Sequence, residues 1–368
     1  MRHELERVEI PGESEAGERA WAILESAFEN RTPTPQRSHW PRVAAVAIAL
    51  AAIVASAASP PGQAVIDEIR EVVGVERAER ALFSLPADGR LLVASDAGVW
   101  VVQPDGSKRL LGEYREASWS PFGRFVVVAG HDELAALERN GDVRWTLPRP
   151  RVRSPRWAGT EVDTRIAYVS RAQPRVVAGD GTGDGPVCAM STHRRVAPAW
   201  TPGSGFVIAV AAPSGAVNVV DLERCVQRWV SAPVVGARRL EWSSDGTSVL
   251  VETLEDVRVL RAGTGAVASV ERATEAAFRP GSRELALIRK RGEVSQVVVG
   301  NRVVFRGAGE LRDLRWSPDG RWVLVAWPAA DQWVFVRSDG RGIRAISNIS
   351  EQFRSRALPR VEGWCCAP

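Results

Sequence analysis

The chain has 368 residues, of which 45% are hydrophobic and 25% are charged, with a formal net charge of +4. This is the balance of an ordinary globular protein. The positive excess is small and comes from arginines scattered through the sequence, whereas a nucleic-acid-binding surface needs basic residues gathered on one face. We therefore expect no nucleic-acid partner.

Residues 1–42 form a polar arm in which one amphipathic helix is predicted. Between Ser14 and Asn30, apolar residues recur at helical spacing and would share one face. Pro33 and Pro35 then end the helix, because proline cannot continue it. This helix is either a plain surface helix or a docking site for a cytoplasmic partner.

An apolar segment follows the arm. The run from Val43 to Ala58 has no charged residue, and we predict that residues 43–60 form a membrane-spanning anchor. Arg37 and Arg42 precede the run, whereas the charged residues that follow it are mostly acidic. The positive-inside rule then places the arm in the cytoplasm and the rest of the chain outside. The expected location is the cytoplasmic membrane, with a single pass.

Two alternatives remain for this segment, because its strictly apolar part is short for a spanning helix. The small residues Ala55-Ser56-Ala57 resemble a signal-peptidase site, so cleavage there would release the rest of the chain. A buried soluble helix is the other alternative. We favour the uncleaved anchor, since an arm of 42 residues is long for a cleaved signal peptide. In residues 61–81, the apolar face of Ala64 to Ala81 predicts a juxtamembrane helix.

From residue 82 onward one short pattern recurs, in which an aromatic residue, a tight turn and an apolar strand follow one another. The clearest copy is Trp316-Ser317-Pro318-Asp319-Gly320 before the strand from Trp322 to Trp327. Proline presets φ in such a turn, and Asp and Gly tolerate the conformations that follow. A looser copy is Leu85-Pro86-Ala87-Asp88-Gly89. Six copies open on an aromatic residue that we expect to pack between repeats: Trp119, Trp157, Trp200, Trp242, Phe278 and Trp316.

The copies lie about 34 to 43 residues apart, which is the spacing of four-stranded propeller blades. After its central strand each copy tends to continue with a third strand, a hairpin turn such as Pro104-Asp105-Gly106, and a fourth strand such as Val143 to Leu147. We therefore predict an all-β fold over residues 82–368, a seven-bladed β-propeller, with six blades as the alternative.

The sequence Trp-Ser-Pro-Asp-Gly before an apolar strand resembles the repeat of TolB-type and WD-repeat-like propellers, and the resemblance extends roughly from Leu82 to Ser347. The fourth strands that carry Trp145 and Trp229 also resemble the repeat of quinoprotein propellers. The resemblance implies a ring of blades but no particular activity, because propellers host many unrelated functions. Propellers often close by pairing strands from both chain ends, and the tail from Val361 to Cys366 is a candidate for such a strand.

All four cysteines follow the apolar segment, which fits an oxidising compartment. Four cysteines allow three connectivities. Cys188 and Cys225 hold similar places in neighbouring repeats, so we favour a Cys188–Cys225 disulfide together with a vicinal Cys365–Cys366 pair. Zinc is disfavoured, because the sequence has no Cys-x-x-Cys spacing.

No catalytic, cofactor or metal site is predicted. The sequence lacks the Gly-x-Ser-x-Gly elbow of propeller-linked hydrolases, and an external triad would have to use His131 or His193. It also lacks a phosphate-binding loop. The loop from Gly179 to Gly185 has one metal interpretation, a calcium ion held by Asp180 and Asp184, although a flexible turn between strands is favoured.

These observations favour a non-catalytic binding or sensing propeller outside the cytoplasmic membrane. Its expected ligand is a protein, a peptide or a cell-wall component, bound on one rim or at the central channel. One alternative is a quinoprotein-like oxidoreductase, since the resemblance to that family implies a vicinal disulfide beside its cofactor. Another is a membrane-bound regulator similar in outline to anti-sigma factors, and a third is a secreted structural propeller. The ligand and the oligomeric state stay open.

Overall fold

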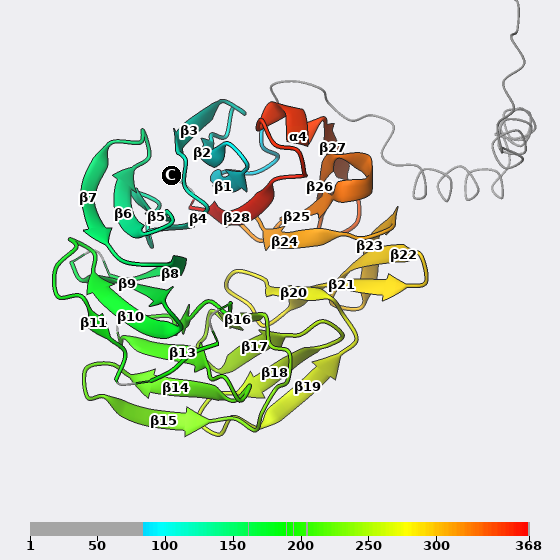
Figure 1. Cartoon of the computed structure of the whole chain (residues 1–368). Helices are drawn as coiled ribbons and strands as arrows, with labels where there is room; N and C mark the ends of the chain where they lie inside the picture. The colour runs from blue at the N-terminus through cyan, green and yellow to red at the C-terminus, as the bar shows by residue number, and fades with distance from the viewer. Residues whose placement is uncertain (1–83, 161, 189, 194, 204, 367–368) are drawn as a thin grey trace, which may run out of the picture. The chain divides into compact units, whose positions relative to one another are not determined.

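Seven four-stranded antiparallel sheets follow one another around a ring (Figure 1). The computed structural model describes residues 84–366 apart from 161, 189, 194 and 204, and these residues belong to one compact unit. The prediction of an all-β, seven-bladed propeller is confirmed, and the six-bladed alternative is wrong.

The predicted arm, anchor and juxtamembrane helix (1–42, 43–60 and 61–81) lie outside the described residues. Within the described part, no helix is long and apolar enough to span a membrane.

Each blade has an innermost strand near the centre of the ring and three further strands that follow outward. From the centre outward, blade 1 consists of β28 (Arg360–Cys365), β1 (Arg90–Ser95), β2 (Gly98–Val102) and β3 (Lys108–Gly112). Blade 2 consists of β4 (Glu116–Trp119), β5 (Phe125–Ala129), β6 (Glu133–Glu138) and β7 (Val143–Pro148). Blade 3 consists of β8 (Val152–Gly159), β9 (Thr164–Ser170), β10 (Gln173–Ala178) and β11 (Gly185–Pro186). Blade 4 consists of β12 (Ala199–Trp200), β13 (Val207–Ala211), β14 (Val217–Asp221) and β15 (Val226–Val230).

The remaining three blades complete the ring. Blade 5 consists of β16 (Arg239–Trp242), β17 (Ser248–Glu252), β18 (Val257–Arg261) and β19 (Val267–Glu271). Blade 6 consists of β20 (Glu275–Phe278), β21 (Leu285–Arg291), β22 (Val294–Val299) and β23 (Arg302–Ala308). Blade 7 consists of β24 (Arg312–Trp316), β25 (Trp322–Trp327), β26 (Gln332–Arg337) and β27 (Ile343–Ser347). The 3-10 turn η1 (Pro328–Ala330) joins β25 to β26, and the helix α4 (Ile349–Gln352) follows β27.

The repeated turn joins the two inner strands of a blade by side-chain hydrogen bonds. In blade 7, the Ser317 hydroxyl oxygen accepts a hydrogen bond from the Trp322 amide (2.9 Å), and the hydroxyl donates one to Asp319 Oδ1 (2.5 Å). Asp319 Oδ1 also accepts one from the Arg321 amide (3.0 Å). Gly320 adopts a φ of 65°, which residues with a side chain rarely do. The residues of the recurring motif therefore determine this turn.

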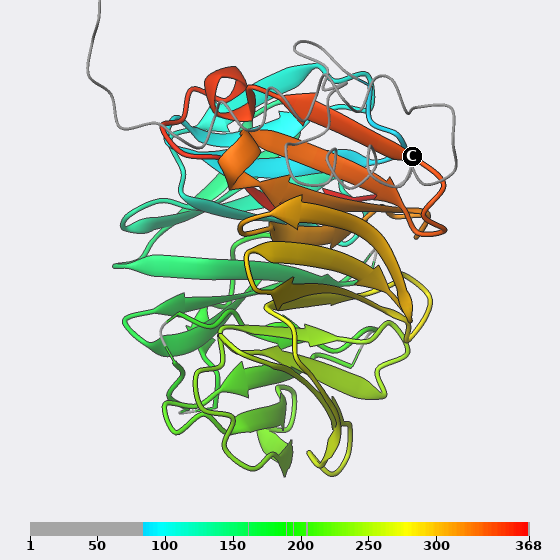
Figure 2. The same cartoon turned by 90° about the vertical axis from the view of Figure 1, so that its right-hand side faces the viewer.

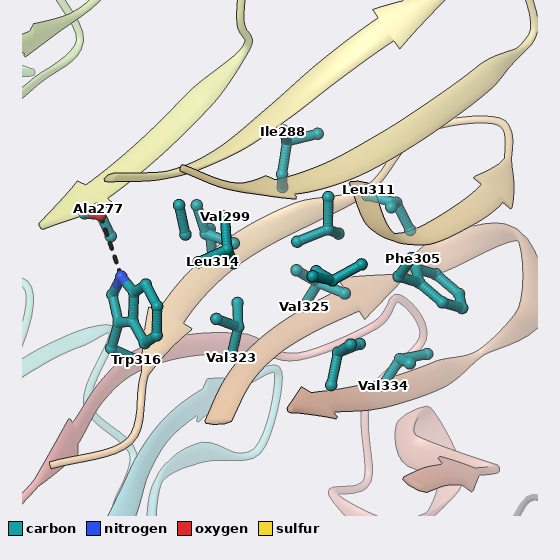
Figure 3. Close-up of a cluster of buried hydrophobic side chains, with 14 of the residues drawn as sticks. Ala277, Ile288, Val299, Phe305, Leu311, Leu314, Trp316, Val323, Val325 and Val334 are labelled. Atoms are coloured by element: carbon teal, nitrogen blue, oxygen red, sulfur yellow. Dashed lines mark hydrogen bonds between the residues drawn. The ribbon is translucent and has the colours of Figure 1, made fainter. Parts of the chain in front are cut away.

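Strand β25 shows how a blade is buried on both faces. Val323 and Val325 pack toward blade 6, in a cluster that includes Ile288 (Figure 3). The alternate residues Leu324 and Ala326 belong to a second cluster with side chains of blade 1. Successive side chains of a strand point to opposite faces. A continuous apolar run is thus what a strand between two other blades requires.

The two ends of the described chain close the ring. Strand β28 pairs with β1, and Trp364 lies opposite Leu91. Figure 2 shows the red and orange C-terminal segments beside the cyan first blade. The tail that was a candidate for closure is confirmed in that role and forms the innermost strand of blade 1. The loose copy from Leu85 to Gly89 therefore has no inner strand of its own, because the other end of the chain supplies it.

Candidate functional site: the central channel

The innermost strand of every blade carries an aromatic residue at or near its end. The structure places the six predicted residues in equivalent positions: Trp119 in β4, Trp157 in β8, Trp200 in β12, Trp242 in β16, Phe278 in β20 and Trp316 in β24. The seventh is Trp364 in β28, which the repeat pattern did not reveal because its turn lies at the other end of the chain. One signal could have found it. Arg360 stands four residues before Trp364, as Arg312 stands four residues before Trp316.

Three of these tryptophans link neighbouring blades through their indole Nε1. Trp200 donates to the carbonyl oxygen of Arg156 (2.9 Å), and Trp242 donates to that of Ala199 (3.1 Å). Trp316 donates in the same way to a carbonyl oxygen of blade 6. Each acceptor directly precedes the aromatic residue of the previous blade. The Nε1 atoms of three other tryptophans are buried without a hydrogen-bond partner: Trp119, Trp157 and Trp364.

Carboxylates satisfy the free edges of the innermost strands. These strands have no further strand on their inner side, so their backbone N–H groups need other partners. Glu241 accepts a hydrogen bond from the Phe278 amide of the next blade (3.0 Å). Glu275 accepts two, from the amides of Asp313 (3.1 Å) and Leu314 (2.9 Å). Equivalent bonds run from the Ser154 amide to Glu116 and from the Val361 amide to Asp313.

A cavity of about 370 Å³ lies between these strands, and its walls come from the innermost strands of six blades. We call it the channel cavity. Its tryptophans are Trp119, Trp157, Trp200, Trp242 and Trp364, and its charged residues are Arg156, Arg239, Arg315, Glu241 and Glu362. The volume is within the range of small-molecule binding sites, which are concave and largely apolar with a few polar groups.

The charged residues of the channel cavity fall into two groups. Arg239 forms ion pairs with Glu241 and with Glu252 of the same blade, and it also donates to the carbonyl oxygen of Ala276 in blade 6 (2.7 Å). Glu362 forms an ion pair with Arg360 (3.0 Å). Arg239 is therefore neutralised within the protein, whereas Glu362 Oε1 is buried without a hydrogen-bond partner in the described part of the chain and Glu362 also lies in the field of Arg156.

Arg156 and Arg315 form the second group. Arg156 donates to the carbonyl oxygen of Pro155 and Arg315 to that of Leu314, in each case over 2.8 Å. Neither guanidinium has a carboxylate within ion-pair distance among the described residues. Burial lowers the pKa of Arg156, the negative charges of Glu362 and Glu116 oppose the shift, and the positive charges of Arg315 and Arg239 act in the same direction as burial. Arg156, Arg239 and Arg315, from blades 3, 5 and 7, are therefore close enough for their positive charges to repel one another.

Burial also acts on the carboxyl groups around the channel. It raises the pKa of Glu241 and of Glu362 above the ordinary glutamate value, although the nearby Arg239 and Arg360 oppose the shift. It raises the pKa of Glu275 to about 7, with help from the charges of Glu252 and Asp313. These carboxyl groups hold their protons more tightly than exposed ones would.

The calcium interpretation of the loop from Gly179 to Gly185 is wrong. The Asp184 carboxylate is buried, and it accepts hydrogen bonds from Arg149, Arg175 and the Tyr168 hydroxyl. Asp180 is engaged with Thr182 in a local turn. The described residues hold no group of His, Cys, Asp and Glu side chains suited to a metal ion.

The predicted Cys188–Cys225 disulfide is confirmed, and it ties blade 3 to blade 4. The structure also joins Cys365 to Cys366. This pair lies against the turn at Gly123, outside the walls of the channel cavity. The two described histidines, His131 and His193, lie in exposed loops, and neither hydrogen-bonds a serine or cysteine side chain in the described part of the chain.

A second concave surface lies between blades 2 and 3 and encloses about 660 Å³. Phe122, Phe125, Trp145 and Trp157 contribute its aromatic walls. The Trp145 Nε1 donates to the carbonyl oxygen of Gly179 (2.9 Å), which fixes this wall to blade 3. Two blades line this groove, whereas residues from six blades line the channel cavity.

Comparison with solved structures finds the same seven-bladed fold in propellers of the WD40 type. The C-terminal WD40 domain of Sif2 matches with 13% identity and a TM-score of 0.51, over 73% of this chain and 88% of that one. The β-propeller domain of Cps50 (Swd1) from Myceliophteria thermophila matches with 12% identity and a TM-score of 0.50, over 63% of this chain and 85% of that one. At such identities the likeness shows the fold alone. No protein-family model and no curated protein sequence matches the chain.

Proposed function

We propose that this protein is a non-catalytic binding or sensing propeller, anchored in the cytoplasmic membrane by residues 43–60 with its propeller outside. Its proposed ligand is a protein, a peptide or a cell-wall component. The observation that carries the proposal is the channel cavity. A closed ring of seven sheets places five tryptophans around one cavity, together with two guanidinium groups that have no carboxylate partner among the described residues. Aromatic and arginine side chains are the residues that dominate binding sites.

Two further observations support this function and its location. Propellers of the WD40 type commonly serve as scaffolds for protein interactions, and the fold is of that type. A disulfide between Cys188 and Cys225 fits an oxidising compartment outside the cytoplasm. The exposed His131 pairs with its neighbour Asp132 and with no other side chain of the described residues, which gives no support to a hydrolase.

The location is tested by fractionating cells that express the full chain and a variant with Ala57→Leu. An uncleaved anchor predicts that both remain in the membrane fraction. A propeller found in the medium, and retained only by the Ala57→Leu variant, would show a cleaved signal and overturn the anchor.

The binding function is tested by capturing partners with the full chain, solubilised in detergent under non-reducing conditions. We expect an extracytoplasmic protein, peptide or cell-wall fragment that a chain carrying substitutions in the channel cavity does not retain. Visible absorbance of the purified protein provides the opposing outcome, because a bound quinone chromophore would identify an oxidoreductase instead.

A further inference from the structure

We propose that the channel cavity binds a carboxylate group, held between the guanidinium groups of Arg156 and Arg315. This inference rests on the proposed function and deepens it, because it names the chemistry of the ligand. The carboxylate belongs to a peptide that enters the channel, either as an acidic side chain or as a free C-terminus.

Arg239 differs from the other two arginines of the cavity in its partners. It bonds to two carboxylates and to a backbone carbonyl of the next blade, so a structural role explains it fully. Within residues 84–366, where the structure describes them, Arg156 and Arg315 donate only to the carbonyl of the preceding residue in their own strands. They link no blades. No carboxylate of the described residues lies within ion-pair distance of either guanidinium group, so both can still bind an incoming anion.

The same walls also hold a set of indole donors. Trp119 and Trp364 are each 8% exposed, and their Nε1 atoms are buried without a partner, as is that of Trp157. The equivalent atoms of Trp200 and Trp242 are bonded across blades. Buried N–H groups in proteins are nearly always paired. The unpaired ones belong to tryptophans in the walls that also carry Arg156.

The charge balance of the cavity decides the kind of anion. The charged walls comprise three arginines and two glutamates, so their sum is +1 when both glutamates are ionised. A carboxylate carries one negative charge and neutralises this sum, whereas a phosphate dianion would overshoot it beside Glu241 and Glu362. The other acidic groups of the innermost strands, Glu116, Glu275 and Asp313, already accept backbone N–H groups. The planar guanidinium fork matches a carboxylate in bidentate geometry.

The experiment measures binding to the full chain in detergent by calorimetry and by the shift of the melting temperature, at constant ionic strength. Acetyl-glutamate-amide and acetyl-glycine present a side-chain and a C-terminal carboxylate. Acetyl-glutamine-amide and acetyl-glycine-amide are their neutral counterparts, and inorganic phosphate is the fifth probe. We expect saturable binding of at least one carboxylate, and a stronger response than with its neutral counterpart. The better of the two carboxylates identifies the source. Equal binding of carboxylate and amide, or binding of phosphate alone, would overturn the proposal.

The variants test the assigned residues. Arg156→Gln and Arg315→Gln should each weaken carboxylate binding by about tenfold or more, since a charge-assisted hydrogen bond is lost. Arg321→Gln, at an exposed turn of blade 7, is the matched control and should bind as the unchanged chain does. Glu362→Gln should change the affinity in the opposite direction. It removes a repelling charge from the cavity, so it should tighten carboxylate binding. A set of folded variants with unchanged affinities would refute the site even if one arginine variant failed to fold.

The two proposals can fail separately. If carboxylates bind but no macromolecular partner is captured, the carboxylate site stands and the proposed class of ligand does not. If a partner is captured equally by the unchanged chain and by Arg156→Gln and Arg315→Gln, the binding function stands and the carboxylate site is wrong.

Discussion

Trp316 of blade 7 donates a hydrogen bond of 3.1 Å from its indole Nε1 to the carbonyl oxygen of Ala277 in blade 6 (Figure 3). The bond crosses from one innermost strand to the next, at the point where neither strand has a further strand to pair with. Trp200 and Trp242 repeat it between other blades. In these three blades the aromatic residue of the repeat therefore both packs between strands and links neighbouring blades.

A substitution at Trp316 separates the contribution of its hydrogen bond to Ala277 from that of the packing of its ring. Trp316→Phe keeps an aromatic ring but leaves the buried carbonyl of Ala277 without its donor, so we expect a loss of about 1 to 3 kcal/mol in the free energy of unfolding. Trp119→Phe is the matched control, because Trp119 is similarly buried but its Nε1 has no partner. Denaturant unfolding of both variants provides the measurement. Equal losses would show that the hydrogen bond contributes nothing beyond ring size.

The repeat could be predicted from sequence because its signals are local. Ser317, Asp319 and Gly320 determine a turn through bonds that span a few residues, and the apolar run after them needs no distant partner to be recognised. Seven such units at blade spacing predict a ring. The Cys188–Cys225 pair followed from the same logic, since equivalent positions in adjacent blades come close together.

Ring closure and the channel could not be predicted in the same way. Trp364 belongs to the first blade only because its strand pairs with β1 from the other end of the chain, and no local pattern states that pairing. Arg156 and Arg315 are ordinary arginines in the sequence. Their role can be inferred only from the folded structure. There, Arg239 pairs with a carboxylate, whereas Arg156 and Arg315 donate to backbone carbonyls. Charge balance inside a channel is a property of the assembled ring.

The raised pKa of Glu275, about 7, predicts a pH-dependent stability. The folded protein holds this proton more tightly than the unfolded chain, whose glutamate titrates near 4.5. The resulting stabilisation is fully present below about pH 4.5 and is lost as the pH rises through about 7, with an upper bound of about 3 kcal/mol. Glu275→Gln should flatten the decline of unfolding free energy between these values. The exposed Glu351→Gln should leave the decline unchanged. A wild-type profile that stays flat from pH 5 to 7 would contradict the assignment.

The disulfide between Cys188 and Cys225 joins residues 37 positions apart, so it restricts the unfolded chain substantially. Replacing both cysteines by serine should lower the free energy of unfolding by about 3 to 4 kcal/mol. The bond between Cys365 and Cys366 encloses no loop, and the same double substitution there should cost clearly less. Denaturant midpoints of the two double variants, measured side by side under non-reducing conditions, test this order. The reverse order would mean that the bridge between blades 3 and 4 is energetically minor.

Removing the closing strand tests the ring itself. A chain that ends at Pro359 lacks β28, so β1 loses its inner partner and the edge-to-face contact of Phe335 with Trp364 (5.5 Å between ring centroids) disappears. Deleting a large buried aromatic residue alone costs about 3 to 5 kcal/mol, and the truncation also exposes a full strand edge. We expect an open, aggregation-prone protein with a strongly lowered melting temperature.

A synthetic peptide of residues 360–366 added during refolding should restore cooperative unfolding, whereas a peptide with Trp364→Ala should not. A chain ending at Cys366 is the control and should melt as the full chain does. A truncated protein that is monomeric and as stable as the control would show that the ring holds together without its closing strand.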